Sequence, residues 1–207
     1  MGLWTERVVP HLTDRALAGE EVTALRGAAC TGLAGRVLEI GFGSGANLPC
    51  YPPEVVAVDA VEPSDLAWRM SADRRAAARV PVRRTGLDGQ RLDADDAAYD
   101  AVLSTFTLCT IPDPALALAE VRRVLRPGGS FHFLEHGLAP DARVATWQRR
   151  LDPVQRTVCG GCHLSRDVPA LVAAAGLVVE DLEESDLPGP AVSRPWTHGF
   201  VGRAVAR

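Results

Sequence analysis

Val37-Leu38-Glu39-Ile40-Gly41-Phe42-Gly43-Ser44-Gly45 is the stretch that decides the fold, because an apolar strand runs there directly into a glycine-rich turn. Glycines in such a turn permit positive φ and let the backbone approach a ligand closely. In open α/β sheets the ligand lies beside such a turn, at the carboxyl ends of the strands. The spacing Gly41-x-Gly43-x-x-Ala46 also fits the dinucleotide-binding pattern, so the turn alone leaves the ligand open.

An acidic residue after the next strand strengthens this prediction. Glu62 lies 21 residues beyond Gly41 and directly follows the apolar run Val55–Val61. A carboxylate at this place can accept hydrogen bonds from both hydroxyls of a ribose. Asp59 is an alternative, although its position falls inside the strand. Neither acid distinguishes a nicotinamide cofactor from another nucleoside-bearing one.

Strand and helix patterns alternate along the chain, which predicts a parallel sheet covered by helices on both faces. Helices are expected from Ser64 to about Ala78, from Asp113 to a stop at Pro127-Gly128-Gly129, and from Asp167 to Gly176. The expected strands are Arg36–Ile40, Val55–Val61, a weaker one at Val80–Arg84, Ala101–Thr105, Ser130–Glu135, Leu177–Leu182 and Gly199–Ala206.

Composition limits the classes of function. The chain has 207 residues, 47% of them hydrophobic and 23% charged, which predicts one globular domain with a real core. Its formal net charge of −4 gives no global electrostatic reason to bind nucleic acid. No apolar run reaches the roughly 20 residues that span a bilayer, and no signal-peptide pattern opens the chain. We therefore expect a cytoplasmic protein with five reduced cysteines.

Four blocks of sequence resemble successive motifs of the class I methyltransferases that use S-adenosylmethionine (SAM). They occur in the order and at the spacing of that family, over about residues 36–135. The blocks are Leu38-Glu39-Ile40-Gly41-x-Gly43-x-Gly45, Val61-Glu62-Pro63-Ser64, Tyr99-Asp100-Ala101-Val102 and Val124-Leu125-Arg126-Pro127-Gly128-Gly129.

The resemblance implies a fold and a division of the chain. The fold would be Rossmann-like, with a mostly parallel seven-stranded sheet, helices on both faces and a small helical lid. The whole chain would be a single methyltransferase domain. Within it we expect a helical cap over residues 1–30, a SAM-binding core over 31–136, a lid insertion over 137–165 and the rest of the sheet over 166–207.

The resemblance also implies roles for individual residues. Glu39 would lie near the methionine end of SAM, and three glycines and Asn47 would line its methionine and ribose. Glu62 would hold the ribose hydroxyls, other residues would contact the adenine, and the end of the fourth strand would lie beneath the methyl donor. The implied cofactor residues are Glu39, Gly41, Gly43, Gly45, Asn47, Glu62, Pro63, Leu66, Leu87, Asp88, Thr105 and Phe106.

A narrower resemblance concerns the methyl acceptor. The chain is similar to the branch that includes microsomal thiol S-methyltransferases and their bacterial relatives, which implies a small thiol acceptor. The alternatives are N-, O- or C-methylation of a small metabolite, a quinone-like ring or a phospholipid headgroup, a nicotinamide-binding oxidoreductase, and a SAM-binding regulator. The motifs are Gly45-Ala46-Asn47, Tyr51-Pro52-Pro53, Thr107-Leu108-Cys109, Phe133-Leu134-Glu135-His136, Trp147-Gln148, Leu151-Asp152-Pro153 and Gly161-Cys162-His163-Leu164-Ser165-Arg166.

Outside these motifs a few residues invite chemical interpretations. His136 ends the fifth strand and is the candidate catalytic base, with a structural role in positioning the lid as the alternative. Cys159 and Cys162 flank two glycines, but the chain offers no second C-x-x-C pair, so we expect no metal and no redox motif. Trp4, Trp147 and Trp196 are expected to be core anchors rather than walls of a pocket.

Overall fold

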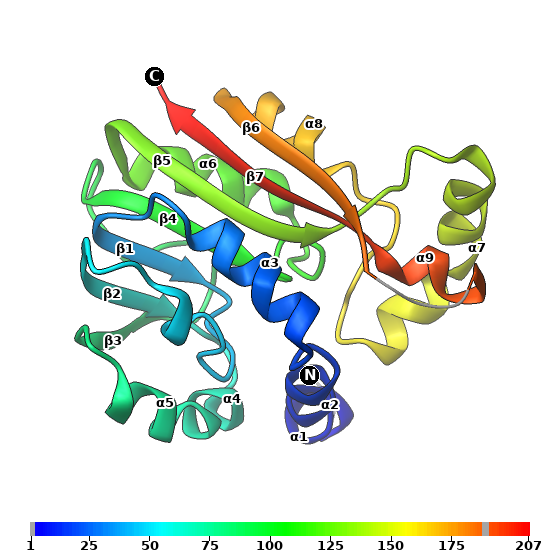
Figure 1. Cartoon of the computed structure of the whole chain (residues 1–207), viewed down its shortest axis with the longest axis horizontal. Helices are drawn as coiled ribbons and strands as arrows, with labels where there is room; N and C mark the ends of the chain where they lie inside the picture. The colour runs from blue at the N-terminus through cyan, green and yellow to red at the C-terminus, as the bar shows by residue number, and fades with distance from the viewer. Residues whose placement is uncertain (1–2, 188–190) are drawn as a thin grey trace.

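Seven strands form one sheet in the computed structural model, which describes residues 3–187 and 191–207. The strand order is β3-β2-β1-β4-β5-β7-β6, and β7 runs antiparallel to both of its neighbours while the other pairs are parallel. The expected mostly parallel sheet is thus confirmed (Figure 1). The strands are β1 Gly35–Ile40, β2 Val55–Val61, β3 Val82–Gly86, β4 Tyr99–Thr105, β5 Leu125–His136, β6 Leu177–Asp186 and β7 His198–Ala206.

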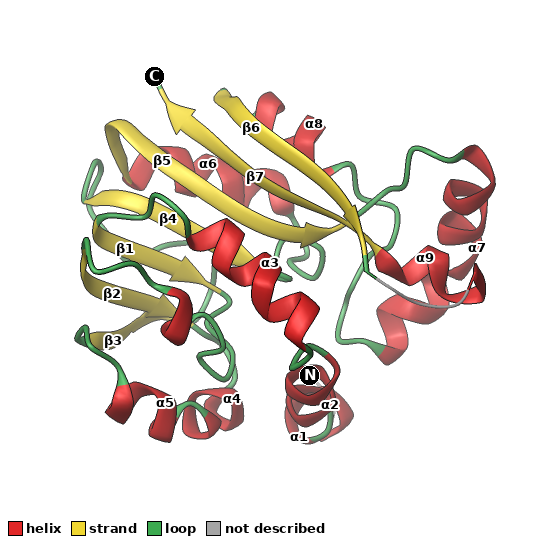
Figure 2. Ribbon diagram, viewed as in Figure 1, coloured by secondary structure: helices red, strands yellow, loops and turns green. Residues whose placement is uncertain are grey.

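Helices cover both faces of this sheet. Figure 2 shows α6 and α8 behind the sheet and α3 in front of it. The α-helices are α1 Leu3–Arg7, α2 Val9–Ala16, α3 Glu20–Cys30, α4 Asp65–Met70, α5 Ala72–Ala77, α6 Pro114–Val124, α7 Ala142–Val158, α8 Val168–Ala174 and α9 Arg194–Thr197, and the short 3-10 turns are η1 Leu48–Cys50 and η2 Ala191–Ser193.

The core has two halves, one on each face of the sheet. Side chains alternate along a strand, so neighbouring residues point to opposite faces. In β1 the side chain of Leu38 belongs to the cluster under α6 and α8, and Val37 belongs to the cluster under α3. Burial on both faces explains why these strands are nearly continuous apolar runs.

Two expected helix boundaries were wrong. The helix that Ser64 caps stops at Met70, and α5 begins after Ser71, whose hydroxyl donates to the carbonyl of Trp68 (2.7 Å) and so competes with the helix ladder. Helix α6 ends at Val124, before the expected Pro-Gly-Gly stop. That stop instead lies inside β5, in an irregular stretch where the pairing with β4 shifts register.

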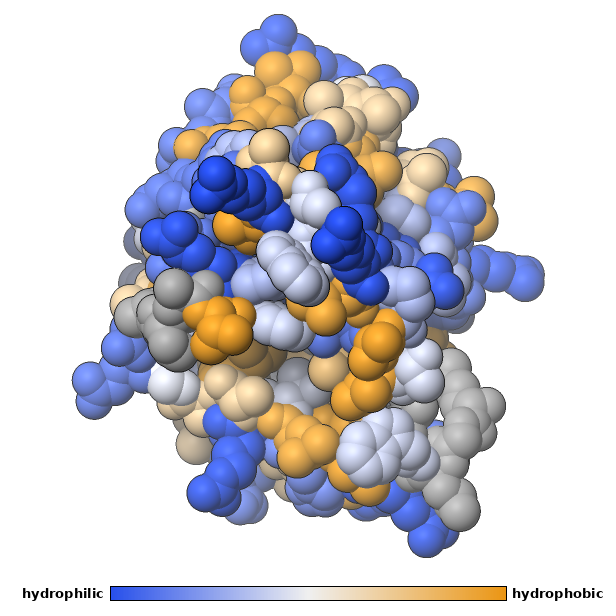
Figure 3. Space-filling model, turned by 90° about the vertical axis from the view of Figure 1, so that its right-hand side faces the viewer, coloured by the Kyte–Doolittle hydropathy of each residue, from blue (hydrophilic) through white to orange (hydrophobic). Residues whose placement is uncertain are grey.

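The three tryptophans expected in the core lie at the surface. Trp4 is 45% exposed, Trp147 54% and Trp196 41%. Trp4 and Trp196 each spend their indole N–H on the α7 region, on the carbonyl of Val158 (2.9 Å) and the amide oxygen of Gln155 (3.0 Å). Figure 3 views the α7 and α9 side of the molecule and shows hydrophobic residues gathered between hydrophilic ones.

In the part of the chain that the structure describes, none of the helices combines the length and the apolar character needed to cross a membrane.

Candidate active site

The glycine turn after β1 is held close to β4. Gly41 has φ +74°, and a Cβ placed on it would come within 1.9 Å of the hydroxyl oxygen of Thr107. A side chain at Gly41 is therefore excluded both by its backbone conformation and by this close approach. Gly43 also has positive φ, +58°, but a Cβ there would meet only open space, its nearest neighbour lying 3.9 Å away. The turn thus leaves room in front of Gly43.

Glu62 lies at the end of β2 and faces this turn. Its side chain is buried, and one carboxylate oxygen accepts a hydrogen bond from the backbone N–H of Gly43 (2.7 Å). The other oxygen accepts from the N–H of Ser64 (2.7 Å). Burial raises the pKa of Glu62, although the two backbone hydrogen bonds oppose that effect. A carboxylate is thus fixed beside the glycine turn, as predicted for a ribose-binding acid.

The alternative acid, Asp59, has a different environment. Arg36 (2.5 Å), Arg83 (3.2 Å) and the hydroxyl of Tyr99 (2.9 Å) all donate to its carboxylate. Burial raises the pKa of Asp59, but these hydrogen bonds outweigh it and hold the pKa below its ordinary value. Asp59 is committed to contacts between strands, as its place inside β2 predicted.

Glu39 lies at the bottom of the site in a network of buried side chains. Its carboxylate accepts hydrogen bonds from the amide of Asn47 (2.7 Å) and from the hydroxyl of Tyr51. Burial raises the pKa of Glu39 to about 7, because desolvation penalises the charged form more than these donors favour it. Tyr51 therefore faces Glu39 and is itself buried.

Arg26 joins this network, and the sequence analysis missed it. Its side chain reaches from α3 and donates to Asn47 (2.9 Å) and to the hydroxyl of Thr105 (2.9 Å). The guanidinium also lies over the ring of Phe106, 5.2 Å from its centre. Among the described residues its Nε finds no hydrogen-bond partner, although Arg26 is only 6% exposed. A buried cation thus stands at the carboxyl ends of β1 and β4.

Helix α2 contacts the glycine turn from the outside. The hydroxyl of Ser44 donates to the carboxylate of Asp14, and Arg74 bridges Asp14 (3.0 Å) and the carbonyl of Ser44 (2.9 Å). Hydrogen bonds from Ser44 and Arg74 lower the pKa of Asp14 against the effect of its partial burial. The first helices of the chain therefore lie beside the predicted cofactor turn.

The residues expected beside an adenine ring lie around the end of β3. Leu66 is half-buried, whereas Pro63 and Asp88 are exposed and Leu87 is 60% exposed. Asp88 accepts hydrogen bonds from the backbone N–H (2.9 Å) and side chain (3.1 Å) of Gln90. The structure brings these four side chains to the surface near the glycine turn rather than into a closed pocket.

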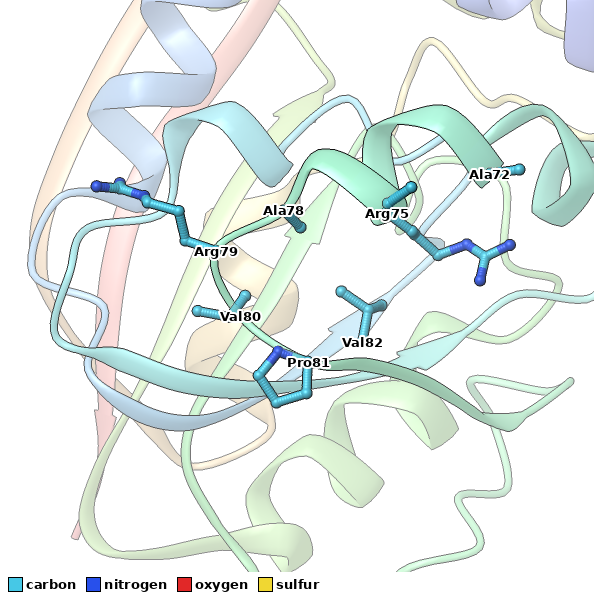
Figure 4. Close-up of a pocket in the computed structure, with 8 residues that line it drawn as sticks. Ala72, Arg75, Ala78, Arg79, Val80, Pro81 and Val82 are labelled. Atoms are coloured by element: carbon cyan, nitrogen blue, oxygen red, sulfur yellow. The ribbon is translucent and has the colours of Figure 1, made fainter.

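A surface hollow of about 460 Å³ lies away from this site. Residues 72–82, from α5 and the segment that leads into β3, provide its lining, with Arg75, Val80 and Pro81 among them (Figure 4). None of the residues predicted to bind the cofactor belongs to it. We do not assign the active site there.

The ends of β4 and β5 form the other wall of the site. Phe106 follows Thr105 with φ +53°, an uncommon conformation for a non-glycine residue. Next to it, the buried carboxylate of Glu135 accepts from the hydroxyl of Ser104 (2.7 Å) and from the backbone N–H of Thr107 (3.0 Å). Burial raises the pKa of Glu135, and these donors oppose it. Glu135 thus holds the turn after β4 in place.

His136 ends β5 beside that turn and contacts a cysteine. Its Nδ1 lies 3.8 Å from Sγ of Cys162, and Sγ of Cys162 lies 3.8 Å from Sγ of Cys109. Within the described part of the chain, Nε2 of His136 is buried and has no hydrogen-bond partner. The sequence analysis had paired Cys162 with Cys159, whereas the structure places Cys109 beside it.

No group of three or more His, Cys, Asp and Glu side chains is positioned to hold a metal ion in the residues that the structure describes.

Comparison with known proteins agrees with this geometry. Residues 38–133 match the family described as "Methyltransferase domain". The chain is 36% identical to the rat thiol S-methyltransferase TMT1B over 175 residues, which are 82% of this chain and 70% of that protein. It is 30% identical to phosphatidylethanolamine N-methyltransferase of Cereibacter sphaeroides over 133 residues, 60% of this chain and 62% of that protein.

A solved structure shares the fold. The YcgJ protein of Bacillus subtilis superposes with a TM-score of 0.73 at 17% identity, covering 91% of this chain and 99% of that one. At this identity the likeness concerns the fold alone.

Proposed function

Because the chain belongs to the class I SAM-dependent methyltransferases, we propose that it transfers the methyl group of SAM to a small thiol. The observation that supports this acceptor most is the 36% identity to a thiol S-methyltransferase over 82% of the chain. We place the reaction in the cytoplasm, where a small thiol acceptor would be in its reduced form.

The residues around the glycine turn fit SAM. Open space in front of Gly43 leaves room for the cofactor, and the buried carboxylate of Glu62 faces that space. We assign Glu62 to the ribose hydroxyls and Arg26, whose Nε has no partner among the described residues, to the carboxylate of the methionine end. Glu39, Asn47 and the glycines then support the same end of the cofactor.

Bound SAM supplies a methyl group on a positively charged sulfur, and the acceptor sulfur takes that methyl while the breaking bond leaves its electron pair on the cofactor. The protein's part is to align the two sulfurs and exclude water. We assign Thr105 and Phe106, at the end of β4, to the surface beneath the transferred methyl. The apolar ring of Phe106, half-buried over Arg26, would shield the site from solvent.

The proton of the acceptor thiol needs only modest help from the protein. A thiol with a pKa of about 8.5 is already a few per cent ionised at neutral pH. We assign the remaining proton transfer to Nε2 of His136, the buried nitrogen without a partner in the described residues. Its other nitrogen, Nδ1, faces Cys162.

The second candidate is N-methylation of a phospholipid headgroup. It is supported by the 30% identity to the C. sphaeroides enzyme, whose match covers a smaller part of the chain than the thiol S-methyltransferase match. An amine acceptor must lose a proton from a far more basic group, so it would depend more strongly on a base such as His136.

Product analysis separates these acceptors. The purified protein is incubated with SAM and, in parallel, with a small alkyl thiol, hydrogen sulfide, a phenol, an amine, and vesicles of phosphatidylethanolamine. We expect mass spectrometry to detect S-methyl products and S-adenosylhomocysteine in equal amounts. Turnover of the phenol, the amine or the vesicles, with no methylation of any thiol, would contradict the thiol assignment and leave the methyltransferase assignment intact.

A further inference from the structure

Two cysteines that are distant in sequence meet beside the proposed acceptor site. Cys109 and Cys162 are 53 positions apart, yet their sulfurs lie 3.8 Å from each other. Cys109 is buried, while Cys162 is partly exposed and also contacts His136. We propose that Cys162 is a site of covalent modification by small disulfides, and that Cys109 converts the adduct into an intramolecular Cys109–Cys162 disulfide.

The surroundings of Cys162 favour its thiolate, the form of cysteine that reacts. A hydrogen bond from Cys109 and the proximity of His136 lower the pKa of Cys162 to about 5, against the opposing effect of burial. The other groups that face this sulfur are Gln155, Cys159 and Arg166, of which Arg166 is a cation. Cys162 is therefore ionised throughout the neutral range.

The other thiols of the chain lack this property. Burial raises the pKa of Cys30, Cys50 and Cys159, so each is mainly protonated near neutral pH. Cys50 and Cys159 are nevertheless partly exposed, as Cys162 is. They are matched internal controls, because they have similar access to solvent without a partner that stabilises the thiolate.

The first step is an exchange between a thiolate and a disulfide. The Cys162 thiolate attacks one sulfur of a small disulfide RSSR, the S–S bond breaks, and RS⁻ leaves with the electron pair and takes a proton from water. The product is a mixed disulfide between Cys162 and R. The small disulfide is the oxidant, so no further co-reactant is needed.

The second step uses Cys109. Its pKa is raised first by the hydrogen bond to Cys162 and then by burial. The mixed disulfide removes the charge on Cys162 and so removes the larger of these two causes. Cys109 can then lose its proton, attack Sγ of Cys162 and displace a second RS⁻. Altogether one small disulfide is reduced to two thiols and the two cysteines are oxidised.

The backbone already holds the two cysteines in place for this reaction. The N–H of His163 donates to the carbonyl of Cys109 (2.8 Å), and the guanidinium of Arg166 donates to the carbonyl of Leu108. The turn after α7 and the turn after β4 are thus joined on both sides of the pair. Since an S–S bond is about 2.05 Å long, the sulfurs need to approach by roughly 1.8 Å, which side-chain rotation can supply.

The experiment treats the reduced, full-length protein with hydroxyethyl disulfide, blocks free thiols with N-ethylmaleimide and maps the peptides by mass spectrometry. We expect a Cys109–Cys162 linked peptide from the wild type and a stable mixed disulfide on Cys162 from Cys109→Ser. Cys159→Ser should behave as the wild type. If Cys109→Ser does not fold, the Cys162→Ser variant must abolish both the adduct and the linked peptide.

The pH dependence adds a second readout. The rate at which Cys162 is modified should change less than about twofold between pH 6 and pH 8, whereas the rate at Cys50 should rise about tenfold per pH unit. Equal labelling of Cys50, Cys159 and Cys162, a Cys159–Cys162 disulfide, or one zinc ion per chain bound by these sulfurs would overturn the proposal. None of these measurements uses methyl transfer, so they succeed or fail independently of the thiol-acceptor assignment.

Discussion

Arg26 on α3 donates a hydrogen bond to the hydroxyl of Thr105 at the end of β4, across 79 positions of sequence, with Nη1 and Oγ1 2.9 Å apart. This bond brings a buried cation to the strand end that we assign to the methyl donor. In a protein interior a guanidinium interacts strongly with a carboxylate, and the methionine end of SAM provides one.

Replacement of this cation should weaken cofactor binding. We expect Arg26→Gln to lower SAM affinity about tenfold or more, because loss of a hydrogen bond to a charged group costs roughly 1.5–3 kcal/mol. Isothermal calorimetry measures the affinity, and Arg15→Gln, an exposed arginine on α2, is the control. If Arg26→Gln melts at a lower temperature but binds SAM with an unchanged Kd, Arg26 is purely structural.

Two neighbouring acids should give opposite results. Glu62→Gln should weaken SAM binding by about 1–3 kcal/mol, because the ribose hydroxyls lose a charged acceptor. Asp59→Asn should leave SAM affinity nearly unchanged and lower the free energy of unfolding, because it disrupts contacts with Arg36, Arg83 and Tyr99. Calorimetry and urea denaturation of both variants test the pair. Weaker SAM binding by Asp59→Asn than by Glu62→Gln would reverse the assignment.

The buried carboxyl group of Glu39 should make stability depend on pH. Burial raises its pKa from the ordinary value of 4.5 to about 7 in the folded protein. The protonated group therefore stabilises the fold fully below about pH 4.5, and this contribution is lost as the pH rises to about 7. The loss is on the order of 3 kcal/mol.

Glu39→Gln removes this titration. Urea denaturation at a series of pH values should show that the wild type loses stability relative to Glu39→Gln between about pH 5 and pH 7, and that the difference is constant above pH 8. Other buried carboxyl groups, such as Glu135, are common to both proteins and cancel in the difference. Parallel curves across the whole range would show that Glu39 does not titrate there.

The role of His136 can be measured through the acceptor. If His136 only assists ionisation of a thiol, His136→Ala should lower the rate modestly at pH 7 and less at pH 9, where the solution supplies thiolate. A loss that is equal at both pH values and accompanied by a lower melting temperature would indicate a structural role. A nearly complete loss across the range would favour an oxygen, nitrogen or carbon acceptor.

The sheet was largely predictable because its signals are local. Apolar runs such as Val55–Val61 and a glycine turn specify buried strands and their connections without knowledge of the rest of the chain. The boundaries that failed depended on tertiary contacts. Pro127-Gly128-Gly129 does break regular structure, but it does so within β5, where pairing with β4 continues on either side.

The site was predictable where one motif carried it and not where distant segments meet. Glu62 and Gly41 belong to two such motifs, and the structure places both at the end of the first strands. Arg26 was missed although it left a signal, since it shares the buried face of α3 with Val22 and Ala29. The contact between Cys109 and Cys162 left none, because nothing in either local sequence refers to the other.

Strand β7 lies between β5 and β6, although it is the last strand in sequence order. During synthesis, β5 therefore presents an unpaired edge until residues 198–206 have left the ribosome, because β6 pairs only with β7. An exposed strand edge can pair with another chain. The time between completion of β5 and arrival of β7 is thus the interval in which the nascent protein most depends on a chaperone to prevent aggregation.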